Sequence, residues 1–456
     1  MLIVPAIVTL LTYLYWRPHQ ILDLFRFLTI NLSLSLAGFA YLLDLRGGAV
    51  RPRGSPLLAL LGGFTLWCLI TMVVRAPDRM GDQLVKLAIP FLVVVLVSEG
   101  IQSLRAFQVV GRTLLLFTVG LAALGVEQGL APTGCFLTYE VEVADAVATG
   151  FDGRACSTRE QCYEGGAPNA EYLCEHQGWL GTASFAGRVR YRGVLEDPNE
   201  LAWALSMGIP FIFAFYEERP SRARLLLTLA GIGVTVACVI MTESRSGQLS
   251  LLANLGVYFI RRYRARGVAA ALLAAVPLLL LGGRSDANAQ SSTDERLNCW
   301  SEAMGMWREN PIMGVGSGQF LEHHFQTAHN SFLLALAEVG PIGLLLWTSA
   351  IYFAIKVTVR VQTDLRGNEE AAVARSWATA LMASMVGLVM SAIFLSLTYH
   401  PILWIFLGMI GALYAVVRKH QPDFQVTFRL PDLMLVGALD VGFISFIAVY
   451  LRLKGV

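Results

Sequence analysis

Charged residues are scarce in this sequence. They make up 15% of the 456 residues, whereas hydrophobic residues make up 55%, and the mean hydropathy is +0.58. An ordinary soluble domain carries about 25% charged residues, so the composition excludes a soluble globular protein of this length. The sequence therefore predicts an all-α polytopic membrane protein.

Apolar segments long enough to cross a bilayer, which takes about 20 residues, recur along the whole chain. They predict twelve or thirteen transmembrane helices, depending on whether the short first segment, Leu2–Trp16, also spans. This segment lacks the basic leader and the small-residue cleavage site of a secretory signal peptide, so we expect a retained helix. The other expected spans are residues 20–43, 56–74, 83–98, 106–126, 199–216, 225–242, 247–260, 268–283, 331–355, 376–395, 401–417 and 433–451.

The distribution of arginine and lysine predicts the orientation, because these residues collect in cytoplasmic loops. When the helices alternate in direction, five basic loops fall on one face, and two long segments share the opposite face. In a Gram-negative bacterium this is an inner-membrane protein whose long segments face the periplasm. The basic loops contain Arg46, Arg51 and Arg53; Arg219, Arg222 and Arg224; residues 261–266; residues 356–375; and Arg418 with Lys419.

The expected spans and long segments divide the chain into five parts. They are N-terminal helices (1–126), a first external segment (127–198), central helices (199–283), a second external segment (284–330) and C-terminal helices (331–456). Residues 127–187 are acidic, with nine Asp and Glu residues against Arg154 and Arg159. This stretch predicts a small insertion that is separate from the helices.

Four of the seven cysteines lie in the first external segment, and none forms a CxxC pair. An oxidising compartment permits disulfides there, so we expect two bridges; four cysteines allow three pairings, and the spacing does not choose among them. A zinc site is the less favoured alternative. Cys299 is external without an obvious mate, and Cys68 and Cys238 are expected to pack inside helices. The four cysteines of the insertion are Cys135, Cys156, Cys162 and Cys174.

Arginines in the external segments are unexpected, because the orientation rule places arginine in cytoplasmic loops. Their position there indicates a local role. Arg188, Arg190 and Arg192 alternate in "GRVRYRGVLEDPNELAWAL", where an extended backbone would point all three to one side. The plainer alternative is a solvated basic strand beside the lipid headgroups. Arg245, in the short connection "TESRSGQLSLL", either joins the same site or simply reaches the membrane surface.

Arg296 opens "ERLNCWSEAMGMWRENP", in which apolar residues recur at spacings of three and four. This periodicity predicts an amphipathic helix on the membrane surface, ended by Asn310 and Pro311. Its apolar stripe consists of Leu297, Trp300, Met304 and Trp307.

His329 and Asn330 stand at the external start of an apolar helix. Asparagine and serine are ordinary capping residues, so the pair could serve the helix alone. However, histidine is the side chain best suited to accept a proton near neutral pH, and arginine binds phosphate through paired hydrogen bonds. Together these residue types suit transfer from a phosphorylated donor to a hydroxyl.

Several of these motifs resemble the O-antigen ligase and O-antigen polymerase superfamily. The pattern His329-Asn330, nine residues, Gly340, two residues, Gly343 is similar to its signature. "RYRGVLEDPNELA", "TESRSG" and "ERLNCWSEAMGMWRENPIMGVGSGQF" follow in the family's order, so the resemblance covers about residues 190–350. The acidic, cysteine-containing insertion is a departure from the family pattern and leaves the acceptor open.

The resemblance implies a membrane glycosyltransferase of the GT-C type that moves a glycan from undecaprenyl diphosphate onto an acceptor hydroxyl, with inversion and without a metal or cofactor. It implies that His329 is the general base and that Arg192 binds the diphosphate. Arg245 and Arg296 are alternatives for the second diphosphate ligand. Arg190 and Asn330 are expected to bind substrate beside them.

Two other site chemistries are disfavoured. "EHHFQTAHN" gathers three histidines and Glu322, but it lacks the HExxH pattern, and adjacent histidines do not easily face one ion on a helix. His323 and His324 are expected to be loop residues near the acceptor groove or simply solvated. The glycines of "GVGSGQF" lack the Lys-Ser or Lys-Thr of a phosphate loop, and we expect a tight re-entrant turn instead.

The sequence leaves ligase and polymerase unseparated. The expected partners are a lipid-linked glycan donor, a glycan or lipid A-core acceptor and membrane lipids, with no nucleic acid. A transporter or flippase of a lipid-linked glycan is the alternative from another class. It would place charges near the bilayer midplane and often shows repeated halves, whereas here the notable charges lie at the external mouths.

Overall fold

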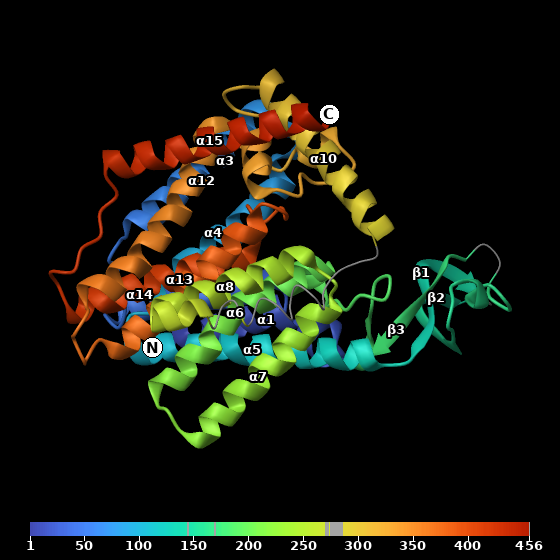
Figure 1. Cartoon of the computed structure of the whole chain (residues 1–456), viewed down its shortest axis with the longest axis horizontal. Coiled ribbons are helices and arrows are strands. Elements are labelled where there is room, and N and C mark those ends of the chain that lie inside the picture. The colour runs from blue at the N-terminus through green and yellow to red at the C-terminus, as the bar shows by residue number, and fades with distance from the viewer. Residues whose placement is uncertain (144–145, 168–169, 270–272, 274–285, 456) are drawn as a thin grey trace.

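The computed structural model describes residues 1–143, 146–167, 170–269, 273 and 286–455. The protein is a helical polytopic membrane protein, as predicted, with one small sheet (Figure 1). Eight helices among these residues are long and apolar enough to cross a membrane. They are α3 (Pro56–Arg75), α4 (Met80–Gly100), α5 (Leu104–Leu130), α7 (Arg222–Met241), α12 (Ser331–Asp364), α13 (Ala372–Ala392), α14 (Pro401–His420) and α15 (Leu430–Lys454).

Four further helices lie in expected spans but are shorter or more polar: α1 (Ile3–Trp16), α2 (Ile30–Arg46), α6 (Pro198–Glu218) and α8 (Arg245–Tyr263). The expected span 268–283 lies almost wholly outside the described residues. Helices α6 and α8 pack against each other and against α13, so protein covers much of their surface and they need fewer apolar side chains. Buried polar contacts join them: Asn254 Nδ2 donates to Ser206 O (2.7 Å).

Close backbone approach holds these central helices together. A Cβ on Gly387 of α13 would lie 1.8 Å from Asn254 Oδ1 of α8, and one on Gly247 of α8 would lie 2.3 Å from the Ala202 Cβ of α6. Small residues at such crossings let membrane helices pack through their backbones, where lipid offers no hydrophobic driving force.

The basic loops gather at one end of the helices, as predicted. Arg53 Nη1 donates to Ala415 O (3.3 Å), and Arg261 Nε donates to Gln362 Oε1 (3.2 Å). We call this the basic end; the N-terminus lies there, on the left in Figure 1.

The opposite end carries both long segments, and we call it the insertion end. There, Tyr191 donates to Trp16 O (2.9 Å), and Arg188 Nε donates to Thr242 O (2.8 Å). These contacts join the external segment to the ends of α1 and α7.

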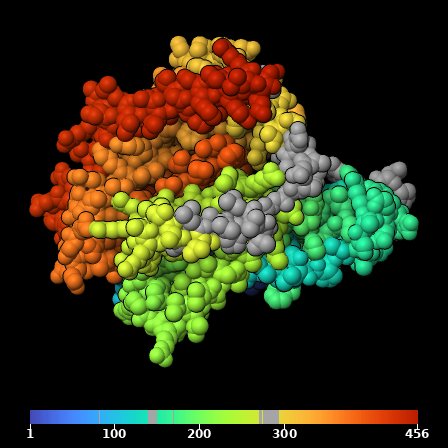
Figure 2. Space-filling view, viewed as in Figure 1, coloured from blue at the N-terminus to red at the C-terminus, as the bar shows by residue number. Residues whose placement is uncertain are grey.

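The acidic insertion folds as a four-stranded antiparallel sheet of order β2-β1-β3-β4. It projects from the insertion end, on the right in Figures 1 and 2. The strands are β1 (Thr133–Val143), β2 (Ala146–Ala155), β3 (Tyr172–Gly178) and β4 (Thr182–Ala183).

The two expected disulfides are confirmed, and the structure selects the pairing Cys135–Cys162 and Cys156–Cys174. The sulfurs of three of these cysteines lie within 4.8 Å of one another, but they are bonded in pairs and so do not supply thiolate ligands for zinc. The sheet has its own small core, and disulfides stabilise a unit with so little apolar burial. That core consists of Cys135, Leu137, Cys156, Cys162, Ala170 and Tyr172.

Helix α10 (Asp286–Glu309) contains the predicted apolar stripe and ends where Asn310 and Pro311 follow. The prediction that the stripe lies on the membrane surface is wrong, because Leu297, Trp300 and Met304 are buried in the protein core. Helix α10 packs on α12 and α15. A surface helix and a docked helix share the same periodicity, and only the neighbouring helices distinguish them.

Candidate active site

His329 lies immediately before α12 at the insertion end. Asn330 caps this helix: its Oδ1 accepts from Phe332 N (3.0 Å) and Leu333 N (3.1 Å). The capping role weighed for the pair therefore belongs to Asn330 and leaves the imidazole of His329 available. His329 itself has a left-handed backbone, with φ +47°, a conformation that costs a non-glycine residue of order 1–3 kcal/mol.

Residues on both sides of His329 are anchored to the α13–α14 connection. Ser331 Oγ donates to Leu395 O (2.6 Å) and accepts from Leu397 N (2.8 Å). On the other side, Thr327 Oγ1 donates to Ser396 Oγ (2.7 Å). These bonds hold the strained residue in place, so the imidazole position is fixed by the fold.

Ionisable side chains of both signs influence the imidazole. Burial is the main cause that lowers the pKa of His329, and Arg296 and His324 lower it further, whereas Asp197 and Glu295 raise it. A lowered pKa keeps the imidazole neutral at neutral pH, the form that accepts a proton. The structure thus brings together two of the predicted site residues, His329 and Arg296, and adds Asp197, the N-cap of α6.

Arg192 is directed to two backbone carbonyls. It donates from Nη1 to Gln20 O and from Nη2 to Leu180 O. The turn that follows it is held by His400, whose Nε2 lies 3.0 Å from Val194 O; burial lowers the pKa of His400 to about 4, so its ring stays neutral. In the described part of the chain, no contact joins Arg192 directly to His329.

The other two arginines of this segment have separate partners. Arg190 Nε donates to Ala183 O (3.1 Å), and its Nη1 lies 3.8 Å from Glu196, the neighbour of Asp197. Arg188 is buried and donates to Thr242 O and to Asn199 Oδ1 (3.0 Å). The three arginines do not share one set of partners: Arg190 and Arg192 both donate to carbonyls of residues 180–183, whereas Arg188 donates to Thr242 and Asn199.

Arg245 is the first residue of α8 and is exposed. Ser244 caps the helix by accepting from Gly247 N (3.2 Å). Across the described ranges, Arg245 has no hydrogen bond or ion pair, so its guanidinium is available at the insertion end.

A cavity of about 300 Å³ lies beside the His329 loop. It is bounded by α4, α6, α12 and the loops around Ser317 and Ser396, and Glu200 faces it one helical turn beyond Asp197. Glu338, an acid inside α12, accepts from Gly318 N (2.9 Å) and Phe320 N (3.0 Å) at its wall. The polar residues that line it are Gln83, Lys86, Glu200, Ser317, Thr327, Glu338, Ser396 and Tyr399.

Glu338 and Glu200 were not among the predicted site residues. An acidic residue within a membrane helix is costly and marks a functional or structural contact, so Glu338 in "LAEVGPIG" was the available signal. Glu200 gave a weaker one, because it lies in the first helical turn, where acids are common.

The glycine-rich stretch forms the predicted re-entrant turn, which packs against a break in α12. Gly340 has φ +67°, and a Cβ there would lie 2.1 Å from Ile312 O. Val315 N donates to Ala337 O (2.8 Å) and Gly316 N donates to Glu338 O (2.8 Å). The turn therefore completes the backbone hydrogen bonds of the broken helix, and α11 (Phe320–His323) leads from it toward His329.

The neighbouring histidines have separate roles. His323 is exposed, and His324 Nδ1 lies 2.9 Å from Gln326 O. Glu322 pairs with Arg79 at 3.1 Å. Within the described residues, the ligand atoms of these side chains and His329 do not gather around a common point.

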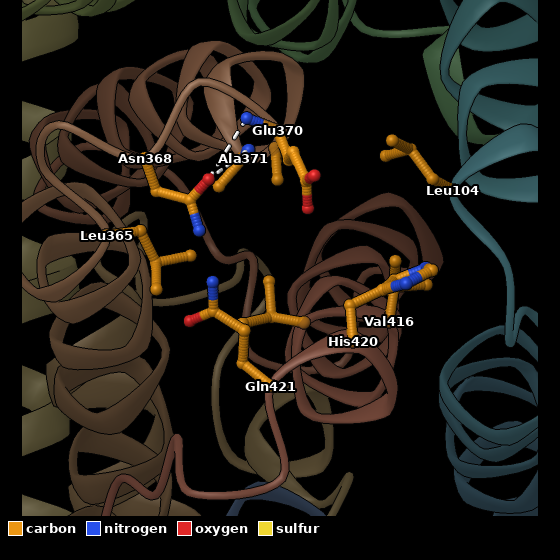
Figure 3. Close-up of a pocket in the computed structure, with 10 residues that line it drawn as sticks. Leu104, Leu365, Asn368, Glu370, Ala371, Val416, His420 and Gln421 are labelled. Atoms are coloured by element: carbon orange, nitrogen blue, oxygen red, sulfur yellow. Dashed lines mark hydrogen bonds between the residues drawn. The ribbon is translucent and has the colours of Figure 1, made fainter.

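A second cavity of about 300 Å³ lies at the basic end. Figure 3 shows Asn368 at its wall, with its side-chain oxygen accepting from the backbone of Glu370 (3.0 Å) and Ala371 (3.3 Å). His420 and Gln421 line the other side. None of the predicted site residues lines this cavity, so it is a poorer candidate.

Part of the chain is similar to a known protein family. Residues 226–348 match the family model described as O-antigen ligase, which confirms the resemblance drawn from the motifs. The matched range contains Arg245, Arg296, His329 and Asn330, whereas Arg190 and Arg192 lie upstream of it. None of the curated proteins matches the chain.

Proposed function

We propose that this membrane protein, whose residues 226–348 match the O-antigen ligase family, transfers a glycan from undecaprenyl diphosphate to an acceptor hydroxyl. The observation that carries the proposal is His329: a half-buried imidazole with lowered pKa, beside Arg296, inside the matched range. The family match supports activity of the O-antigen ligase or polymerase type in general, and the specific donor, acceptor and mechanism are part of the proposal.

In the proposed step, the acceptor oxygen attacks the anomeric carbon while His329 takes the hydroxyl proton. The bond from that carbon to the diphosphate oxygen breaks, and its electrons leave with the lipid diphosphate. A single displacement of this kind inverts the anomeric carbon. Preorganised cations lower the barrier by stabilising the charge that develops on the leaving group, so guanidinium groups would serve where other enzymes use a metal.

Arg192 is the first proposed diphosphate ligand, and Arg245 and Arg296 are the two alternatives for the second. Arg296 lies close enough to His329 to affect its pKa, and Arg245 is an exposed cation. A guanidinium has five N–H donors, so Arg192 retains donors beyond the two carbonyls that it contacts. We propose substrate-binding roles for Arg190 and for Asn330, whose Nδ2 is buried and has no hydrogen-bond partner among the described residues.

We further propose that the insertion end faces the periplasm of a bacterial inner membrane. The orientation rule for basic loops supports this assignment, as do two disulfides at the insertion end, since disulfides persist in oxidising compartments. Residues 127–198 and 284–330 would then be the periplasmic parts between three groups of transmembrane helices.

The alternative of a transporter or flippase has less support. Two acids buried within the spanning helices contact neutral groups: Glu338 accepts from backbone amides, and Asp440 accepts from Thr348 Oγ1 (2.8 Å). Transporters use intramembrane charges to bind substrate in transit, and these acids are already occupied.

The test is a transfer assay with purified protein and a lipid-linked glycan donor. We expect His329→Ala to reduce transfer by at least about 100-fold, the lower bound for loss of general base catalysis, and Arg192→Ala to reduce it as well. His323→Ala is the matched control, because this histidine is exposed on the same loop. Normal transfer by His329→Ala would disprove its assignment as the base.

A second experiment separates ligase from polymerase. Lipopolysaccharide from a deletion strain, resolved on a gel, shows a bare core with retained lipid-linked chains for a ligase. It shows a core with a single repeat unit for a polymerase. An unchanged pattern would direct attention to another acceptor, such as an exopolysaccharide.

A further inference from the structure

Two loops at the insertion end are tied together by Arg192. One joins α1 to α2 (residues 17–29), and the other follows β3 (residues 179–187). Arg192 donates to Gln20 O in the first loop and to Leu180 O in the second. We call them the paired loops.

The paired loops expose large apolar side chains. The exposed fraction is 76% for Leu24, 65% for Phe27 and 67% for Trp179. Within a spanning helix, contact with lipid tails would explain such exposure. These residues, however, lie outside the spanning helices. An exposed apolar patch of this kind marks an interaction surface. Leu22, Leu180 and Phe185 are also exposed in the same loops.

Hydrogen bonds to two helix ends set the depth of the paired loops. Trp179 N donates to Glu127 Oε2 (2.7 Å), in the last turn of α5. Tyr191, next to Arg192, donates to Trp16 O (2.9 Å), at the last residue of α1. Helix α5 is a candidate membrane span and packs on α1, so these bonds hold the paired loops beside the end of a helix that is long and apolar enough to cross the bilayer.

Basic groups accompany the apolar ones. The guanidinium of Arg190 lies 5.3 Å from the ring centre of Phe185. Arg17 packs against Gly193, where a Cβ would lie 2.3 Å from Arg17 Nε. Tryptophan and other aromatic residues are enriched at membrane interfaces, and basic residues near the surface are attracted to anionic headgroups.

We propose that the paired loops seat on the bilayer leaflet at the insertion end, with Trp179, Leu24 and Phe27 at the boundary between headgroups and acyl chains. The headgroup phosphates then lie level with the arginines of this segment. This accounts for external arginines that the orientation rule disfavours. This contact with the leaflet also holds the end of β3 at the membrane, because Trp179 directly follows that strand. The inference does not depend on the proposed transfer reaction.

Fluorescence quenching, with Trp179 as the probe, tests whether the paired loops contact the bilayer. The protein is placed in nanodiscs of phosphatidylethanolamine and phosphatidylglycerol with brominated acyl chains, and iodide serves as the quencher in water. Because the chain has nine tryptophans, the informative quantity is the difference between wild type and Trp179→Phe. We expect the quenchable component lost in Trp179→Phe to respond to bromolipid and to be protected from iodide.

Trp203→Phe is the control. Because Trp203 is fully buried, its replacement should remove neither fluorescence that bromolipid quenches nor fluorescence that iodide quenches. Leu24→Trp checks the other loop and should add a component that bromolipid quenches. The proposal is overturned if the Trp179 component is quenched by iodide as strongly as by bromolipid, or more so. It is also overturned if the Leu24→Trp component responds to iodide alone.

Discussion

The α12 region around His329 and the disulfide-bonded insertion share one end of the molecule but are held in different ways. Around His329, a glycine-rich turn completes the hydrogen bonds of a broken helix, and Ser331 and Thr327 tie the loop to the α13–α14 connection. The insertion has a core of a few residues and two disulfides. The first region depends on tertiary packing, and the second depends on covalent bonds.

The family match covers the first region and excludes the second, because it runs from residue 226 to residue 348. We therefore expect the packed region to determine whether transfer occurs, and the insertion to influence which acceptor is used. Changes to the two regions should have separable effects on folding and activity.

The largest expected effect is that of Gly340→Ala. Gly340 has φ +67° and ψ −174°, a backbone region that only glycine adopts readily and that costs another residue about 1–3 kcal/mol. The added Cβ would also meet Ile312 O at 2.1 Å. We expect a lower melting temperature in detergent and loss of transfer. Gly233→Ala is the matched control, because a Cβ there meets nothing within 4 Å. Equal melting temperatures for the two variants would contradict the packing argument.

A smaller effect on transfer is expected from removing one disulfide, because the structural damage should be confined to the insertion. Replacing Cys135 and Cys162 with serine should destabilise the sheet by about 2–5 kcal/mol. Limited proteolysis should then cut within the insertion while the helical bundle stays intact. Cys299→Ser is the control, because this cysteine is buried and unbridged. Cleavage in the bundle at the same rate would show that the two regions unfold together.

The smallest effect is a displacement of the pH profile of transfer. His329 must be neutral to accept a proton, so the rate should rise with pH through its pKa and then level off. Arg296 lowers the pKa of His329 and Asp197 raises it. Arg296→Gln should therefore move the acidic limb to higher pH, and Asp197→Asn should move it to lower pH. If the acidic limb moved in the same direction in both variants, the electrostatic assignment would be contradicted.

Much of the bundle could be predicted from the sequence because membrane helices need long apolar runs. The same logic placed the basic loops at one end and His329 with Arg296 at the other. The re-entrant turn followed from its glycines. These features depend on local composition and on the alternation of helices.

Contacts between distant segments could not be predicted. The sequence gives no sign that Arg192 meets Gln20, that α10 docks on α12, or that Cys135 pairs with Cys162. Each depends on which elements the folded chain brings together. Glu338 was missed for a related reason: its partners, Gly318 and Phe320, become neighbours only when the turn packs on the broken helix.

The backbone of His329 has a practical consequence. Glycine would adopt this backbone conformation, with φ +47°, with less strain than histidine does. Glycine at this position would remove the proton acceptor and relax the loop together. Such a variant would be more stable and inactive, so the structure of its complex with both the lipid-linked donor and the acceptor could be determined.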